Sequence, residues 1–191
     1  MRVGRASRET KETKVSAEVN LDGMGQCSCS TGYRFLDHMV ATLSKHSLVD
    51  IDLKAEGDLR HHIIEDSGIV LGMAFDKALD TRMGIRRFGY ALVPMDEALA
   101  YAAVDLVRRP KPVINFAAKL EVVEDIPVSE LTHFLESFTT SLNAAVHVKV
   151  VEGFDDHHKV EAGFKALALA LKQAVEVEPR IKGPPTTKGM M

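Results

Sequence analysis

The sequence predicts an α+β fold in which two similar βαβ-type repeats follow one another, each a sheet packed on helices. Three observations lead to this prediction. Several segments alternate apolar and polar residues, as half-buried strands do. Other segments repeat apolar residues at helical spacing. One succession of histidine, helix, strand and histidine pair occurs twice along the chain, which indicates an internal duplication.

Period-two alternation identifies the strands. Apolar residues occupy every second position from Val15 to Leu21, and again from Val49 to Ala55, where a Gly-Asp pair ends the pattern. The strands expected from alternation are 14–23, 48–57 and 145–150, with a weaker candidate at 113–122.

Helical spacing identifies five further segments. In the first of them Phe35, Met39 and Leu43 share one face of the expected helix. The helices expected are 35–46, 65–79, 95–106, 131–142 and 161–175. The second and the last of these have similar lengths, and each begins just after a pair of adjacent histidines.

The duplication is clearest in the histidines. His38 opens a helix, a strand follows, and the sequence His61-His62-x-x-Glu65 begins another helix. The second half repeats this order with His133, His157, His158 and Glu161. The lone histidine precedes the pair by 23 positions in the first copy and by 24 in the second. We therefore expect a first repeat at 1–84 and a second at 85–191, with a C-terminal tail at 182–191, in one compact domain overall.

Composition narrows the class of protein. The chain has 191 residues, 46% hydrophobic and 27% charged, with a net charge of −3, so no strong basic field calls for nucleic acid. No apolar run approaches the ~18 residues of a membrane span. The polar N-terminus lacks the apolar core of an export signal. Cys27 and Cys29 are too close for a useful disulfide and suit a reducing compartment. We expect a cytoplasmic protein with no nucleic acid and no membrane among its partners.

The repeated histidines predict metal ligands. On a helix, His61 and Glu65 share a face, as do His157 and Glu161, because residues four apart lie one turn apart. The second histidine of each pair points about 100° round the helix, so one pair can serve two ions on two sides. The expected ligands are His38, His61, His62, Glu65, His133, His157, His158 and Glu161.

The ligand types point to the metal. Eight ligands shared by two ions leave four for each, with open positions for water or substrate. Imidazole and carboxylate without thiolate suit Mn, Fe, Co or Zn, and we favour Mn²⁺ because it accepts more than four ligands. A single histidine pair at a helix start is usually surface or a cap, but two matched copies favour metal. His46 either reaches the pocket of His38 or is a helix C-terminal imidazole, and His147 is expected on the surface.

Several motifs together resemble the imidazoleglycerol-phosphate dehydratase family. They are "FLDHM" with a histidine eight positions on, "HHIIEDSGIVLG", "GIRRFG", "LVPMDEAL", "DDHHKVEAGFKALALAL" and the terminal "TTKG". The resemblance covers nearly the whole chain in order. It implies a carbon–oxygen lyase of histidine biosynthesis that removes water from imidazole glycerol phosphate, giving imidazole acetol phosphate. It also implies two Mn²⁺ ions per active site, a phosphorylated imidazole substrate, and active sites shared within twenty-four copies built from trimers.

The resemblance assigns further site residues. It implies that Glu12 is the acid/base group and that Arg87 and Arg109 bind the phosphate. His62 and His158 are counted as catalytic as well as metal-binding. Lys165 follows Glu161 by one turn and either faces the metal pocket or forms a surface ion pair. The remaining residues expected to bind substrate are His46, Thr186 and Lys188, the last two in a tail that could order over the phosphate.

Two other functions use the same residues. A di-metal hydrolase acting on a phosphate ester would need similar ligands, although such enzymes usually bridge their metals with aspartate. A metal-dependent shell, in which the histidines only bridge subunits, would need no phosphate-binding residues. Release of inorganic phosphate would identify the hydrolase, and substitutions of the arginines without effect on any ligand would favour the shell.

Overall fold

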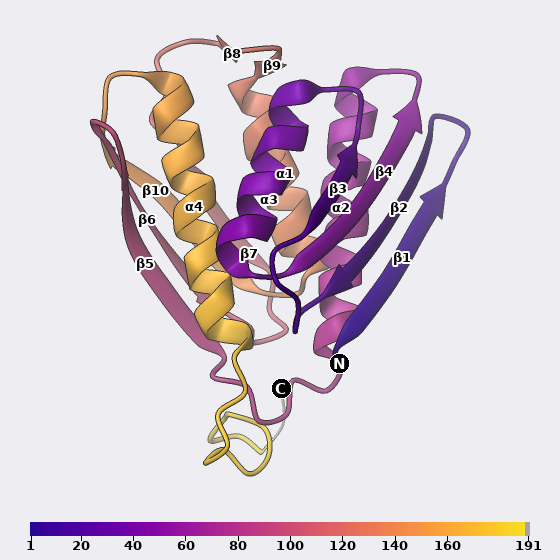
Figure 1. The fold of residues 1–191 in the computed structure, drawn as a ribbon, viewed down its shortest axis with the longest axis vertical. Helices are drawn as coiled ribbons and strands as arrows, with labels where there is room; N and C mark the ends of the chain where they lie inside the picture. Colours follow the sequence, from indigo (N-terminus) through magenta and orange to yellow (C-terminus); the bar gives the residue numbers. More distant parts are fainter. Residues whose placement is uncertain (190–191) are drawn as a thin grey trace.

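A computed structural model describes residues 1–189 of the chain as two sheets with four helices between them (Figure 1). The last two residues of the expected tail, 190–191, lie outside the described range. Among residues 1–189, no helix is both long enough and apolar enough to cross a bilayer.

The first half forms a four-stranded sheet in the order β1-β2-β4-β3. Its β3 and β4 are parallel and α1 connects them, whereas the other pairs are antiparallel. The elements are β1 (Val3–Glu9), β2 (Thr13–Asn20), β3 (Cys27–Ser30), α1 (Arg34–Ser47), β4 (Asp50–Gly57) and α2 (Arg60–Leu79).

The second half repeats this topology in the order β5-β6-β10-β7, with β7 and β10 parallel and α3 between them. A small hairpin, β8–β9, is added before α3. The elements are β5 (Phe88–Met95), β6 (Ala98–Asp105), β7 (Lys111–Asn115), β8 (Val122–Val123), β9 (Ile126–Pro127), α3 (Val128–Ser141), β10 (Ala145–Glu152) and α4 (Asp156–Val175). The predicted duplicated α+β fold is confirmed.

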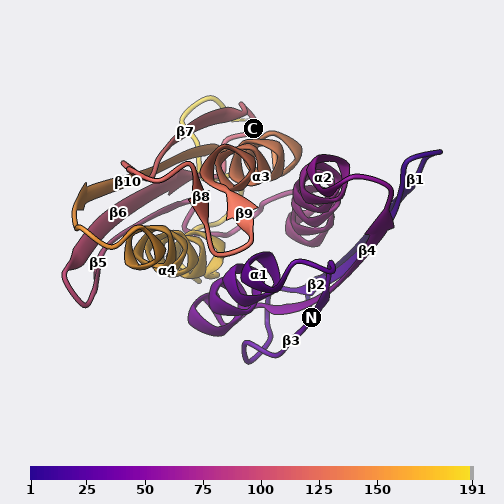
Figure 2. The ribbon, with the colours of Figure 1, turned by 90° about the horizontal axis from the view of Figure 1, so that it is seen from above.

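The helices lie between the two sheets and join the halves (Figure 2). Helix α2 packs on α3 and α1 packs on α4, so the two main contacts between helices cross from one half to the other. Gly68 and Gly72 of α2 make this approach close: a Cβ at either position would meet the carbonyl oxygen of Phe134 or Phe138 on α3. All four helices begin at the same end of the molecule, beside the β8–β9 hairpin (Figure 1). This common end is where the histidine motifs lie.

The predicted helix at 95–106 is wrong. Met95 ends β5, Asp96 and Glu97 form the turn, and Ala98–Asp105 is β6. The alanines favour a helix by intrinsic propensity, but Ala98, Ala100, Ala102 and Val104 are buried at every second position. Pairing with β5 on one side and β10 on the other outweighs local propensity. Of the weak candidate at 113–122, only the part within Lys111–Asn115 and a short piece at β8 are strand.

A buried arginine holds the connection between the halves. The Arg82 side chain is fully buried, donates to the carbonyl oxygens of Leu142 and Asn143 at 2.6 and 2.9 Å, and pairs with Asp76 of α2. Its guanidinium therefore ties the end of the first half to the turn between α3 and β10 in the second.

Candidate functional site

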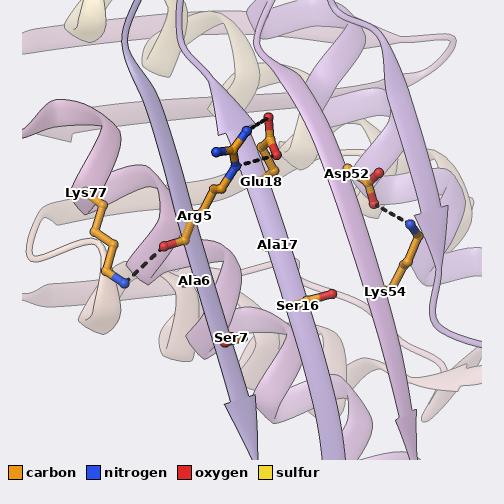
Figure 3. A pocket seen from close by; sticks show the side chains of 9 residues that line it. All are labelled: Arg5, Ala6, Ser7, Ser16, Ala17, Glu18, Asp52, Lys54 and Lys77. Atoms are coloured by element: carbon orange, nitrogen blue, oxygen red, sulfur yellow. Dashed lines mark hydrogen bonds and ion pairs between the residues drawn. The ribbon is translucent and has the colours of Figure 1, made fainter.

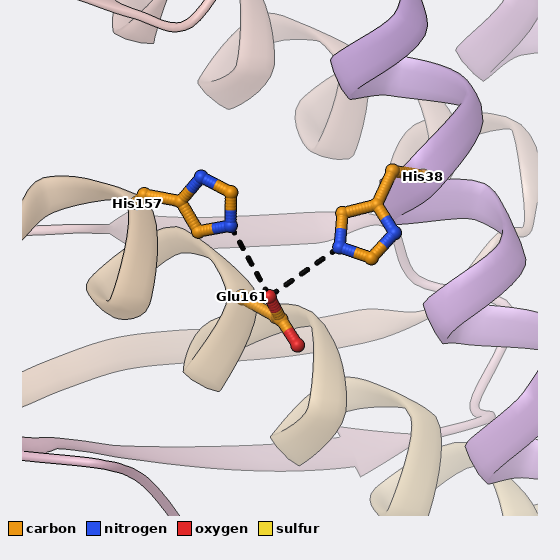
Figure 4. A group of neighbouring side chains, drawn as sticks. All are labelled: His38, His157 and Glu161. Atoms are coloured by element: carbon orange, nitrogen blue, oxygen red, sulfur yellow. Dashed lines mark hydrogen bonds and ion pairs between the residues drawn. The ribbon is translucent and has the colours of Figure 1, made fainter.

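The first group of candidate ligands lies between α1 and α4 (Figure 4). Glu161 Oε2 is 3.4 Å from His38 Nε2 and 3.3 Å from His157 Nε2. His157 and Glu161 share a face of α4 because they are one turn apart, and His38 faces them from α1. We refer to His38, His157 and Glu161 as the α1–α4 triad.

The second group lies between α2 and α3. Glu65 stands 3.6 Å from His61 Nε2 and 3.4 Å from His133 Nε2, each measured to one of its carboxylate oxygens. The rings of His61 and His133 stack with centroids 5.3 Å apart. We refer to His61, Glu65 and His133 as the α2–α3 triad. It is the counterpart of the α1–α4 triad in the duplicated fold.

Each triad draws ligands from both halves of the chain. The His-x-x-x-Glu pair comes from the long helix of one half, and the lone histidine comes from the other half. Within each triad one ligand atom of every residue lies within 4.8 Å of the others. Two imidazole nitrogens and a carboxylate form a donor set suited to Mn, Fe, Co or Zn. The residues therefore fit a divalent transition metal in each triad.

His62 and His158 lie outside both triads, and a carboxylate holds each ring through Nδ1. His62 Nδ1 is 2.9 Å from Asp58 Oδ1, and His158 Nδ1 is 2.8 Å from Glu97 Oε2. These hydrogen bonds raise the pKa of both histidines. On each ring, Nε2 faces away from the carboxylate that holds Nδ1. A second carboxylate, that of Asp96, is 3.6 Å from His158 Nε2.

The α1–α4 triad has further charged neighbours. Lys165 Nζ is 2.7 Å from Glu161 Oε1, as the i,i+4 spacing predicted. Burial raises the pKa of Glu161, but the hydrogen bonds and charges of Lys165 and His38 together outweigh it, so the pKa is lowered. The pKa of His46 is lowered by burial and then by the charge of Lys165. The charge of Lys165 thus acts on His46, which is not a member of the triad. Glu124 of the β8–β9 turn is 3.0 Å from His157 Nδ1.

The residues predicted to bind the phosphate line a cavity that is separate from both triads. It has a volume of about 360 Å³ and is lined by Arg87, Val107, Arg108, Arg109, Thr186, Thr187 and Lys188. Arg87 forms two hydrogen bonds with Asp105, at 2.6 and 3.0 Å, and donates to the carbonyl oxygen of Pro185 at 2.9 Å. It therefore anchors the tail. Within residues 1–189, Arg109 and Lys188 form no ion pair, which leaves their charges available.

The C-terminal tail, which lines the cavity, follows the last turn of α4 and lies at the opposite end of this helix from its first turn (Figure 1). His157 is in the first turn of this helix, and the Arg87 N–H donates to the carbonyl oxygen of Ala174 in its last turn. Seventeen residues at 1.5 Å rise separate these points by about 25 Å. One small substrate therefore cannot contact both the triad and the cavity of the same chain.

Glu12 lies in the turn between β1 and β2. Its carboxylate is 3.8 Å from His62 Nδ1, and its side chain is 59% exposed. It stands beside His62 and not within either triad.

A polar hollow on the outer face of the first sheet contains no predicted site residue (Figure 3). Arg5 pairs with Glu18 at 2.7 Å, and Lys54 with Asp52 at 3.6 Å. Lys77 donates to the carbonyl oxygen of Arg5. Two of the three cations are paired with carboxylates and Lys77 is held by a backbone carbonyl, so nothing in the hollow singles it out as a second site.

Several site residues were missed by sequence reasoning. Asp58 had a usable signal, because it lies four positions before His62. Glu97, Asp105 and Glu124 had none, because a carboxylate in a turn or at a strand end is common and only folding brings these to their partners.

The duplicated fold with two His-His-Glu triads defines a class of protein with paired candidate metal centres built across its two halves. The family model described as imidazoleglycerol-phosphate dehydratase matches residues 31–171, and the chain belongs to this family. It is therefore a dehydratase of the hydro-lyase class, as its motifs predicted.

Similar proteins agree over the full length of the chain. The imidazoleglycerol-phosphate dehydratase of Methanocella arvoryzae is 46% identical over 194 residues, and that of Koribacter versatilis 44% over 195, each covering 100% of both chains. The crystal structure of the Staphylococcus aureus enzyme has a TM-score of 0.84 at 28% identity, covering 92% of this chain and 99% of that one. The Pyrococcus furiosus enzyme in complex with (S)-C348 has a TM-score of 0.83 at 34% identity, covering 97% and 99%.

Proposed function

We propose that the chain removes water from imidazole glycerol phosphate to give imidazole acetol phosphate, in L-histidine biosynthesis in the cytoplasm, and that the reaction depends on Mn²⁺. The observation that carries this proposal is the pair of His-His-Glu triads in a member of the dehydratase family. Other divalent transition metals suit the same donors.

The α1–α4 and α2–α3 triads would each hold one ion. A metal bound there supplies Lewis acidity, which lowers the pKa of a coordinated imidazole ring. The chain supplies the rest of the chemistry. Glu12, exposed at a hairpin turn, is suited to take or give a proton. Lys165 keeps Glu161 ionised and lies with His46 beside the α1–α4 triad, where both can bind the substrate.

The phosphate of the substrate would bind in the cavity beside the C-terminal end of α4, away from the α1–α4 triad. Arg109 and Lys188 offer free charges, and Thr186 offers a hydroxyl. Arg87 contributes charge while it holds the tail that carries Thr186 and Lys188. Guanidinium and ammonium groups are the usual partners of phosphate oxygens.

We propose that the complete active site is shared between copies of the chain. Two features support this. The cavity is about 25 Å from the triad on α4 by helix length, too far for one small substrate. In addition, each triad has three candidate protein ligands, while His62 and His158 belong to neither triad and are held by carboxylates through Nδ1. We propose that these two histidines act in sites completed by other copies, within an assembly of twenty-four copies built from trimers.

The outer face of the second sheet is the surface best suited to contact between copies. Phe88, Tyr90 and Leu92 of β5 are 58%, 75% and 64% exposed there, with Tyr101 of β6 beside them. The equivalent face of the first sheet carries the paired charges of Figure 3. An exposed aromatic and aliphatic patch of this kind marks an interaction surface. We assign it to a second copy of the chain, since the proposed site is incomplete without one.

The test uses metal-stripped protein with imidazole glycerol phosphate, with and without added Mn²⁺. Formation of the ketone product, release of inorganic phosphate and particle size are followed together. The expected result is ketone only with Mn²⁺, no phosphate release, and growth to a large assembly. Growth without ketone would overturn the proposed reaction and leave the histidines as structural bridges, and phosphate release would indicate a hydrolase.

A further inference from the structure

Glu97 uses both of its carboxylate oxygens. One oxygen accepts from the backbone N–H groups of Phe154 and Asp155, at 3.2 and 2.8 Å, and the other meets His158 Nδ1 at 2.8 Å. The hydrogen bonds from Asp155 and His158 lower its pKa to about 2. The carboxylate is therefore ionised and fixed in place, with its side chain only 22% exposed.

Glu12 occupies the equivalent place in the first half. It directly precedes β2, as Glu97 directly precedes β6. The two differ in their contacts, because His62 takes Asp58 as its Nδ1 partner at 2.9 Å and leaves Glu12 at 3.8 Å. Asp58 lies four positions before His62. The residue four positions before His158 is Phe154, which has no carboxylate, so Glu97 fills that role.

From this contrast we infer that the duplicated carboxylates have divided their work: Glu97 is a positioning residue that holds His158 with Nε2 free to bind metal, whereas Glu12 stays free for proton transfer. The inference rests on the proposed function, since it gives His158 a metal to bind. A carboxylate that accepts from Nδ1–H fixes the tautomer whose Nε2 carries the lone pair. This is the form in which a histidine coordinates a metal through Nε2.

The variant Glu97→Gln tests the inference with little change in shape. Its amide oxygen can still accept from Phe154 and Asp155, which preserves the turn. Its NH₂ group then faces His158 Nδ1, and an N–H donor there favours the tautomer with the proton on Nε2, which cannot coordinate. Two variants serve as matched controls. Glu12→Gln alters the equivalent carboxylate, and Asp96→Asn alters the carboxylate next to Nε2 in a left-handed position that asparagine tolerates.

The readout is Mn²⁺ affinity, measured by calorimetric titration of the metal-stripped full chain, together with its melting temperature. We expect Glu97→Gln to weaken one class of Mn²⁺ site about 10- to 100-fold, the usual cost of losing such a partner, with both controls close to wild type. Wild-type affinity in Glu97→Gln would overturn the inference and leave Glu97 as a turn anchor. Absence of Mn²⁺ binding in the wild-type chain would overturn the proposed function as well, so the two failures are distinguishable.

If Glu97→Gln does not fold, Glu97→Asp provides the second measurement. It keeps the charge and the acceptors but shortens the reach to His158 by one methylene. Weakened Mn²⁺ binding at an unchanged melting temperature would support the inference, and unchanged binding would overturn it.

Discussion

The two triads of this chain have the same ligands but different surroundings. Both combine a His-x-x-x-Glu pair with a histidine from the other half. Around them the halves diverge: Glu161 is paired with Lys165, whereas the residue one turn after Glu65 is Ile69. His62 and His158 also take their Nδ1 partners from different places, namely Asp58 in the loop before α2 and Glu97 in the β5–β6 turn. The two halves have thus kept the candidate metal ligands and differ in the charged groups around them.

The largest effect is expected from removing the histidine of the His-x-x-x-Glu pair, which both triads have. His61→Ala and His157→Ala each delete one ligand from one triad. We expect each variant to lose about one of two Mn²⁺ ions per chain and its turnover to fall more than about 100-fold, because the proposed reaction uses both metals. Metal analysis by mass spectrometry with a ketone assay measures both. Loss of both ions from either variant would show that the triads are not independent.

The next prediction distinguishes the role of Glu12 from that of its counterpart Glu97. Glu12→Gln removes the exposed carboxylate beside His62 without touching a triad. We expect turnover to fall about 10²- to 10⁴-fold, the usual contribution of an acid/base group, with Mn²⁺ content unchanged. The assay is turnover per metal-loaded site. A variant that keeps full turnover would remove Glu12 from the mechanism.

The outer faces of the two sheets give a third comparison. Tyr90→Asp places a charge on the apolar patch of the second sheet, and Ser16→Asp places one on the polar face of the first. We expect the first change to split the assembly into smaller particles and the second to leave it intact, because a charge opposes burial only where a partner covers it. Analytical ultracentrifugation measures particle mass. Equal particle masses for the two variants would show that the interface lies elsewhere.

A smaller effect is expected in the phosphate cavity. Arg109→Ala removes a free guanidinium, and a hydrogen bond to a charged group is worth about 1.5–3 kcal/mol, so KM should rise about 10- to 100-fold. Lys54→Ala in the hollow of the first sheet serves as the matched control and should leave KM unchanged. An unchanged KM in Arg109→Ala would place the phosphate outside this cavity.

The smallest effect is expected from a variant that gives the second half the carboxylate arrangement of the first. Phe154→Asp in the Glu97→Gln background introduces a carboxylate four positions before His158, as Asp58 precedes His62. Phe154 is 76% exposed, so the change removes no core packing. We expect Mn²⁺ affinity to recover by about 10-fold relative to Glu97→Gln, because the new carboxylate would again accept from His158 Nδ1. No recovery would show that this loop cannot bring the new carboxylate to Nδ1.

Much of the site was predictable because its geometry is local. Residues four apart share a helix face, so His61 with Glu65, and His157 with Glu161, followed from spacing alone. The repeated spacing also predicted two copies of one fold. The strand β6 was not predictable in this way, because its alanines suit a helix and only its partners on both sides select the sheet.

The duplication, the candidate ligands and the pairs within each long helix could be predicted from the sequence alone. Which lone histidine joins which pair could be read only from the tertiary structure. His38 meets His157 and Glu161 because α1 packs on α4 across the two halves, and His133 meets Glu65 because α2 packs on α3. The division between Glu12 and Glu97 was decided in the same way. Contacts between residues far apart in the chain depend on how helices and sheets pack, and spacing along the chain does not encode that packing.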